Sequence, residues 1–157
     1  MEMPFVRQSS KDNTFLFLGN KASILVSGED TKGRYSTILM EERRGFEPPP
    51  HIHMKEDETF YVLEGEVIYN IADSVIQASP GTYVYAPRGI SHTFKLNTET
   101  AKVLVSVYPS GFEHFVKELS VPVPQELPPV PIGPPSPQEI QNLISIALKY
   151  GIEITTV

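Results

Sequence analysis

The chain has no cysteine among its 157 residues, and this absence excludes several kinds of chemistry. Without thiols there are no disulfides, no thiolate nucleophile and no cysteine-ligated zinc site. The chain also lacks a run of roughly 20 apolar residues, the length that a membrane-spanning helix needs. Its first residues have neither the basic region nor the apolar core of a secretory signal, so we expect a cytoplasmic location.

Basic residues are in short supply. Lys and Arg number 13 against 19 Asp and Glu, which gives a formal net charge of −6. Nucleic acids and anionic membrane surfaces attract proteins that present a basic face. The charge balance therefore argues against both as the main partner. The length of the chain and its 40% hydrophobic content are sufficient for a single domain with a real core.

Short apolar or alternating segments, separated by turn residues, make up most of residues 14–108. Eight of them have the pattern of β-strands: Thr14–Leu18, Ala22–Ser27, Tyr35–Glu41, Glu58–Leu63, Glu66–Ala72, Thr82–Ala86, His92–Leu96 and Val103–Tyr108. Gly19-Asn20 is expected to form the turn of the first hairpin. Because no helical pattern separates the strands, we expect an all-β fold, either an antiparallel sandwich or a barrel.

The character of the sequence changes after residue 108. Ser110 is expected to cap a short helix from Gly111 to Leu119. Residues 121–137 then contain eight prolines, which favours an extended arm in place of a regular element.

A second helix is predicted at the end of the chain. Ser136 has the place of its N-cap, Glu139 completes a capping box, and Gly151 follows its last turn. We therefore divide the chain into 1–120, a barrel with N-terminal strands, and 121–157, an arm and a helix. The apolar face of that helix needs a groove on the barrel or on a partner subunit, and the second case makes the protein a homodimer.

Three of the four histidines have a spacing that suits a metal site. His51 and His53 are two residues apart, so on a strand both imidazoles point to the same face. Four intervening residues can form a turn that brings Glu58 beside them, and His92 follows another strand and can close the set. Three neutral imidazoles and one carboxylate converging on one point make a site for a divalent transition metal.

These residues fall within two motifs that resemble those of the cupin superfamily. The first is Gly45-x5-His51-x-His53-x4-Glu58-x6-Gly65, and the second is Gly81-x5-Pro87-x-Gly89-x2-His92. The resemblance implies a jelly-roll barrel, also called a double-stranded β-helix, followed by short C-terminal helices. It also implies His51, His53, Glu58 and His92 as the ligands of one divalent metal.

The sequence around the motifs looks like that of single-domain, quercetinase-like cupins. The resembling segments are Gly28–Tyr35, Pro48–His51, Glu56–Gly65 and Pro109–Glu113. Flavonol dioxygenases of this group hold a divalent metal through three His and one Glu. The resemblance therefore implies a dioxygenase that acts on a flavonol or a similar enol-bearing aromatic with dioxygen. Glu58 is then also a candidate base for the enolic proton. Fe, Mn, Ni, Co and Cu all suit such ligands, and Zn could bind without redox chemistry.

Apolar side chains are predicted to form a wall beside this site. Phe60 and Val62 share the strand parity of Glu58, and Phe94 and Leu96 share that of His92. If the strands are regular, these four side chains point into the barrel. Such a wall suits an aromatic or otherwise apolar substrate, although the same residues serve equally well as plain barrel core.

The fold and the metal site leave other functions open, because one fold supports many activities. The main alternative is a non-catalytic metal-binding cupin that binds or senses a small metabolite. A sugar isomerase or epimerase would need a polar lining, against which the apolar wall argues. Thiol dioxygenases usually use three histidines without a carboxylate, so Glu58 argues against that branch.

Overall fold

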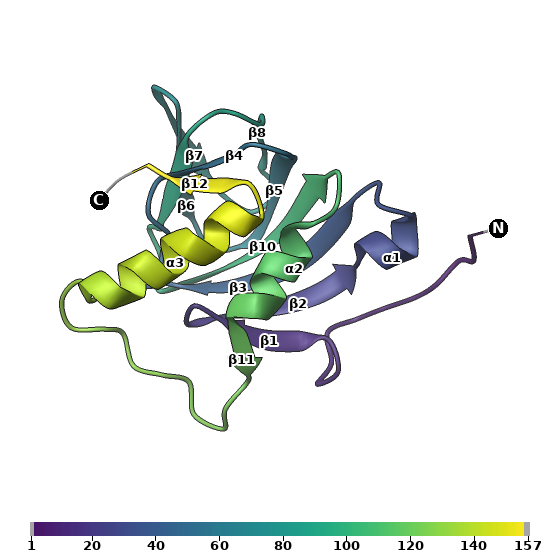
Figure 1. The fold of residues 1–157 in the computed structure, drawn as a ribbon, viewed down its shortest axis with the longest axis horizontal. Helices are drawn as coiled ribbons and strands as arrows, with labels where there is room; N and C mark the ends of the chain where they lie inside the picture. Colours follow the sequence, from purple (N-terminus) through teal and green to yellow (C-terminus); the bar gives the residue numbers. More distant parts are fainter. Residues whose placement is uncertain (1, 156–157) are drawn as a thin grey trace.

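The computed structural model describes residues 2–155 and consists mainly of two antiparallel β-sheets (Figure 1). Across the larger sheet the strands are β11 (Ser120–Pro122), β1 (Thr14–Phe17), β2 (Asn20–Val26), β3 (Ser36–Arg43), β10 (Thr100–Tyr108), β5 (Asp57–Glu64) and β8 (Tyr83–Ala86). Across the smaller sheet they are β12 (Ile152–Ile154), β4 (His51–His53), β9 (His92–Leu96), β6 (Val67–Ile71) and β7 (Ser74–Ala78). The helices are α1 (Gly28–Thr31), α2 (Phe112–Leu119) and α3 (Pro137–Lys149). The predicted all-β jelly-roll barrel with C-terminal helices is confirmed.

One hydrophobic core fills the space between the two sheets. In β10 the buried residues Ala101, Val103 and Val105 alternate with more exposed ones, the period of two that a sheet with one buried face requires. Tyr69 on β6 faces them from the smaller sheet and is almost fully buried. The core is therefore built by the inward half of each strand, and the outward half is free for other roles.

The first hairpin turns one residue earlier than predicted. Its two turn residues are Leu18 and Gly19, with φ of 47° and 87°, and Phe17 pairs with Asn20 at the start of β2. Positive φ at both positions is what a type I′ hairpin turn requires. The prediction of a Gly19-Asn20 turn was wrong because Asn20 is held in the sheet, where its Oδ1 accepts a hydrogen bond from the backbone N–H of Arg43 at 2.8 Å.

The two predicted helices are present, but the cap of the first is different. Gly111, and not Ser110, is the N-cap of α2, and no side chain caps this helix in the usual way. The Glu113 carboxylate instead accepts the N–H of Gly111 at 2.6 Å. At α3 the predicted capping box is present, with Ser136 and Glu139 each bonded to the backbone of the other.

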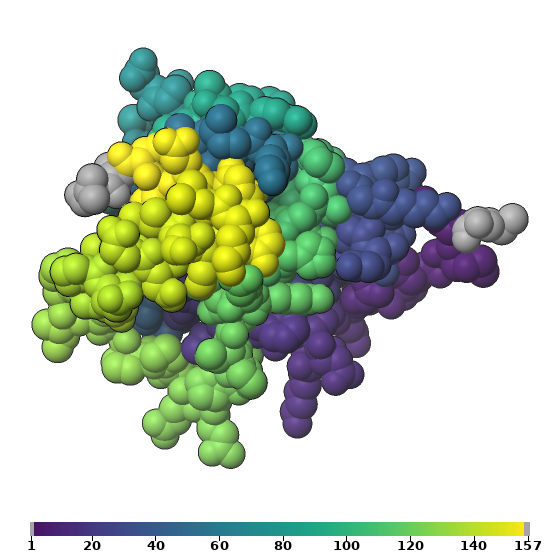
Figure 2. All heavy atoms as spheres, in the orientation of Figure 1, coloured from purple at the N-terminus to yellow at the C-terminus, as the bar shows by residue number. Residues whose placement is uncertain are grey.

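Helix α3 lies across the barrel of its own chain, and the arm loops out between β11 and α3 (Figures 1 and 2). Arg43 donates a hydrogen bond to the carbonyl of Pro128 in the arm at 2.8 Å. Ala147 of α3 packs with Phe115 of α2 and Ile152 of β12 in a second apolar cluster. The division of the chain into two domains remains a prediction. Among residues 2–155 no helix combines the length and apolarity needed to cross a membrane, and the cytoplasmic location also remains a prediction.

Candidate metal centre

The four predicted ligands come together where the two sheets meet. His51 and His53 lie on β4 and His92 on β9, and His51 pairs directly with His92. Glu58 comes from β5 of the larger sheet and faces them. One ligand atom from each of the four residues lies within 4.8 Å of all the others. The structure therefore brings together residues that are up to 41 positions apart in the chain.

Polar atoms in this cluster are buried without a hydrogen-bond partner. Oε2 of Glu58 lies 3.0 Å from Nε2 of His53 and 3.1 Å from Nε2 of His92. All three atoms are nevertheless without a hydrogen bond to any described residue, because the geometry of these contacts is not that of hydrogen bonds. Buried polar groups without partners are rare and costly. A divalent transition metal fits this donor set and would satisfy all three atoms at once.

Two acceptors hold the imidazoles of β4 in place. Nδ1 of His51 lies 2.8 Å from the carbonyl oxygen of Pro49, and Nδ1 of His53 lies 2.9 Å from Oε1 of Glu56. Because both partners are acceptors, each Nδ1 carries a proton and each Nε2 is left free to bind a metal. Glu56 is a residue that the sequence reasoning missed. The sequence did signal Glu56 by its position three residues after His53. The turn between β4 and β5, however, decides where its side chain points.

The electrostatics of the cluster favour an ionised Glu58. Burial by itself would raise the pKa of Glu58, but the neighbouring His53 and His92 lower it. Burial would likewise lower the pKa of His53, yet the Glu58 and Glu56 carboxylates raise it. At His51 burial prevails and lowers the pKa to about 4. Without a metal, the site therefore pairs a carboxylate with a protonated His53, and a metal would displace that proton.

The four predicted wall residues point into the barrel, as their parity requires. Phe60, Val62 and Leu96 are at most 5% exposed and belong to the core, and the ring of Phe60 lies 5.9 Å from that of His92. Phe94 is only partly buried and packs against Tyr69. Their role in holding a substrate remains a prediction. Phe112 of α2, which the sequence reasoning did not include, meets the ring of His53 edge-on at 5.2 Å.

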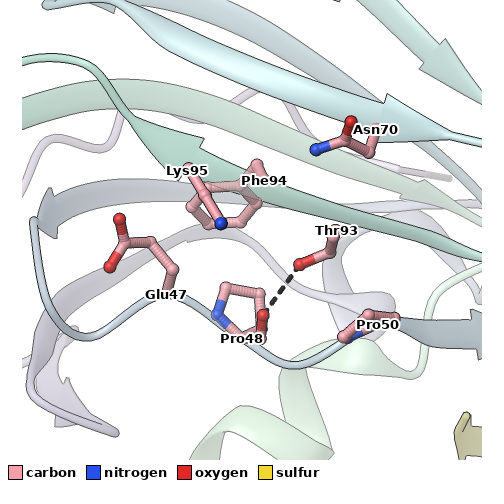
Figure 3. A pocket seen from close by; sticks show the side chains of 7 residues that line it. All are labelled: Glu47, Pro48, Pro50, Asn70, Thr93, Phe94 and Lys95. Carbon is pink, nitrogen blue, oxygen red and sulfur yellow. Dashed lines mark hydrogen bonds between the residues drawn. The ribbon is translucent and has the colours of Figure 1, made fainter. Parts of the chain in front are cut away.

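A groove of about 490 Å³ is lined by residues of β6, β9 and the segment before β4 (Figure 3). Thr93, the residue after His92, lines it and donates a hydrogen bond to the carbonyl of Pro48 at 2.8 Å. The full lining is Glu47, Pro48, Pro50, Asn70, Thr93, Phe94 and Lys95. None of the four candidate ligands lines it, so Phe94 is the predicted site residue that connects the groove with the core.

The barrel also holds a buried carboxyl group that the sequence reasoning missed. Glu42 on β3 is 7% exposed and shares the inward parity of Ile38 and Met40. Its carboxyl forms no hydrogen bond with any side chain or backbone group in residues 2–155. Burial, together with the charges of Glu47 and Glu58, raises its pKa to about 8. The raised pKa favours the protonated form of Glu42 at neutral pH.

The fourth histidine belongs to another cluster. His114 lies near Glu29 and Glu113 at the start of α2, and its side chain is 48% exposed. The Glu113 carboxylate is already occupied, because it accepts the N–H groups of Gly28 and Gly111. This cluster therefore ties α1 to α2 and gives no indication of a bound metal.

Comparison with known proteins agrees with the fold. Residues 38–108 match the family model described as the cupin domain. Quercetin 2,3-dioxygenase from Bacillus subtilis (strain 168) is 27% identical over 120 residues, which is 76% of this chain and 36% of that protein. The chain therefore spans about a third of the length of this relative.

Solved structures share the barrel at low sequence identity. KdgF from Halomonas sp. superposes with a TM-score of 0.61 at 18% identity, over 71% of this chain and 98% of that one. A predicted oxalate decarboxylase from Thermotoga maritima superposes with a TM-score of 0.57 at 20% identity, over 68% and 99%. Residues 38–108 therefore resemble the cupin domain, as the two motifs predict, and the solved structures share its fold.

Proposed function

We propose that this protein is a metal-dependent dioxygenase of the quercetinase type, acting on a flavonol or a similar enol-bearing aromatic. The observation that carries the proposal is the convergence of three imidazoles and one carboxylate, in which Nε2 of His53, Nε2 of His92 and Oε2 of Glu58 are buried without hydrogen bonds. The similarity to quercetin 2,3-dioxygenase supports the choice of reaction. The ligands would be His51, His53, Glu58 and His92.

A divalent metal at this site, whether Fe, Mn, Ni, Co or Cu, would acidify the enolic hydroxyl of the substrate and support oxygen chemistry. We propose Glu58 as the acceptor of the enolic proton, and its lowered pKa, which favours the carboxylate, supports this role. The ring of Phe60 lies against His92 and would orient an aromatic substrate beside the site. The apolar surroundings would keep water away from the reacting atoms.

The groove beside β9 is the proposed route of the substrate. It is lined by the apolar side chains of Pro48, Pro50 and Phe94 and by the polar side chains of Asn70 and Lys95, among others (Figure 3). A volume of about 490 Å³ is in the range of small-molecule sites, roughly 300–1,000 Å³. Phe94 reaches from the groove to Tyr69 in the core, 5.7 Å away between ring centres, so it stands between the groove and the interior.

The test is anaerobic reconstitution of metal-free protein with each candidate metal, followed by quercetin and air. The proposal expects loss of the flavonol absorbance together with oxygen uptake for at least one metal. The His53→Ala variant should bind no metal and show neither signal. Phe94→Ala should keep its metal and change KM more than kcat. If no metal produces both signals in the wild-type protein, the dioxygenase proposal fails.

A non-catalytic metal-binding cupin is the second candidate, and the closed surroundings of the site favour it. His53, Glu58 and His92 are 2–4% exposed, and no candidate ligand lines either the groove beside β9 or a second groove of about 210 Å³ beside Glu42 and Leu127. A protein of this kind would bind or sense a small metabolite. It would show a ligand-dependent rise in melting temperature, while mass spectrometry would find the ligand unchanged.

A further inference from the structure

The outward face of the larger sheet carries two parallel rows of side chains. Leu39, Leu104, Tyr61 and Tyr83 are cross-strand neighbours on β3, β10, β5 and β8, and we name them the large row. Two residues further along the same strands lie Thr37, Ser106, Thr59 and Tyr85, which we name the hydroxyl row. The residues between the rows, such as Ile38, Val105 and Phe60, point inward and belong to the core.

Neither row contains a charged residue. Charged residues return beyond both rows, at Glu41, Lys102 and Glu64 past the large row and at the Asp57–Arg88 ion pair past the hydroxyl row. The other sheet differs, because the outward side of β9 presents Lys95. Two molecules of like net charge repel each other, and a face without charge adds no further repulsion where they meet. The rows therefore mark the part of the larger sheet that suits contact with another protein.

The tyrosines on this face are themselves largely exposed to solvent. Tyr61, Tyr83 and Tyr85 are 39%, 62% and 53% exposed, and Tyr108 at the end of β10 is 41% exposed. Tyrosine is enriched in protein interfaces, since it buries a large area at a small cost in entropy. At ~150–250 Å² for each buried aromatic side chain, these four supply roughly 300–500 Å². A standard interface needs ~800 Å² on each partner, so the tyrosines supply about half of it.

No helix covers the rows in the described part of the chain. Val116 of α2 belongs to the core cluster between the sheets, so this helix lies on the inner side of the larger sheet. Helix α3 packs on α2 and β12. The helix that the sequence offered as a contact between subunits is therefore used within its own chain, and the two rows remain open.

We propose that a second copy of this chain docks on these two rows. The larger sheets of the two copies then face each other, and a two-fold axis lies between them, parallel to the rows. This axis reverses the strand direction of the partner. It also places the large row of each copy over the hydroxyl row of the other. Leu104 then faces Ser106, Leu39 faces Thr37, and Tyr61 faces Thr59, in both directions.

This arrangement is self-complementary in shape. Thr37 and Thr59 are 9% and 6% exposed and lie low between their neighbours, whereas Tyr61 and Tyr83 stand out from the sheet. Tyr61 of one copy would therefore fill the low position of Thr59 in the other, while Tyr83 would meet Tyr85, which is 53% exposed. An isologous interface requires that each contact occur twice by symmetry, which the two rows allow. Sheets that pack face to face lie ~10 Å apart with strands roughly aligned, as this arrangement requires. The proposal goes beyond the enzymatic function and does not depend on it.

The test is the mass of the full-length protein in solution, measured by sedimentation equilibrium over a dilution series. Wild type should have twice the 17.5 kDa mass of one chain. Leu104→Arg and Tyr61→Arg should each reduce it to the mass of one chain, with circular dichroism showing that the barrel is still folded. Val75→Arg is the matched control, because Val75 is 68% exposed on β7 of the other sheet. It should leave the dimer intact.

A mixing experiment tests the two-fold arrangement itself. Leu104→Arg and Ser106→Asp should each be monomeric alone and should form a mixed dimer together, because position 104 of one copy faces position 106 of the other. A wild-type protein that is monomeric at all concentrations would overturn the proposal. A dimer that survives both Leu104→Arg and Tyr61→Arg would also overturn it, since the interface would then lie elsewhere.

Discussion

Nδ1 of His53 lies 2.9 Å from Oε1 of Glu56, and both side chains are almost fully buried. Glu56 thus contacts a candidate metal ligand but is not one of the four residues whose ligand atoms converge. A carboxylate in this position fixes the tautomer and orientation of the imidazole and makes its other nitrogen a stronger donor. The metal affinity of this site should therefore depend on a residue outside the ligand set.

Glu56→Gln should weaken metal binding about 10- to 100-fold while leaving the fold intact. The amide keeps the size of the side chain but removes the negative charge that supports His53. Competition with a chromophoric chelator measures the affinity. Asp57→Asn is the matched control, because the neighbouring Asp57 bonds to Arg88 at the surface and not to an imidazole. Equal affinities for Glu56→Gln and the wild type would contradict this role.

His53→Ala should abolish metal binding, because it removes one of four ligands from a site held by β4, β5 and β9. The barrel should stay folded, since His53 is not part of the hydrophobic core cluster. Elemental analysis of the purified variants gives the metal content for each chain. His114→Ala is the control, because His114 is half-exposed on α2 and should leave the metal content unchanged. Full occupancy in His53→Ala would rule out the proposed ligand set.

Glu42 should make the metal-free protein less stable as the pH rises. Its pKa is raised from 4.5 to about 8, so between these values the folded protein keeps a proton that the unfolded chain has lost. Stability falls with pH wherever the folded state binds more protons, here by at most about 1.4 kcal/mol for each pH unit.

The Glu42→Gln variant isolates this effect. The amide cannot ionise, so its free energy of unfolding should exceed that of the wild type increasingly as the pH rises from about 5 to about 8. Urea unfolding of both metal-free proteins across this range measures the difference. Parallel pH profiles would show that Glu42 ionises in the folded barrel as it does in water.

Gly65→Ala should destabilise the barrel more than Gly81→Ala. Both glycines have positive φ, 82° and 93°, so alanine costs ~1–2 kcal/mol at either position. At Gly65 a Cβ would also lie 2.5 Å from the carbonyl oxygen of Thr100, whereas at Gly81 nothing lies within 4 Å. We expect an additional ~1–3 kcal/mol at Gly65 from this overpacking. Urea unfolding of the two variants measures the difference, and equal losses would contradict it.

Much of the fold follows from local patterns that the sequence contains in full. The alternation of β10 and the capping box at Ser136 need no long-range information, because strand parity and helix caps involve residues a few positions apart. Four elements were missed; β7 and α1 are local, and the other two are of the opposite kind. Strands β11 and β12 are three residues long and exist because β1 and β4 offer them a partner.

The sequence by itself determined which residues can bind a metal. Imidazole and carboxylate chemistry belongs to the side chains, and the spacing of His51, His53 and Glu58 places them on facing strands. Only the tertiary structure decided what surrounds them. The contact of Glu56 with His53 depends on a turn, and the raised pKa of Glu42 depends on burial between two sheets. The two outward rows depend on the register of four strands, and register is a property of pairing that no single strand contains.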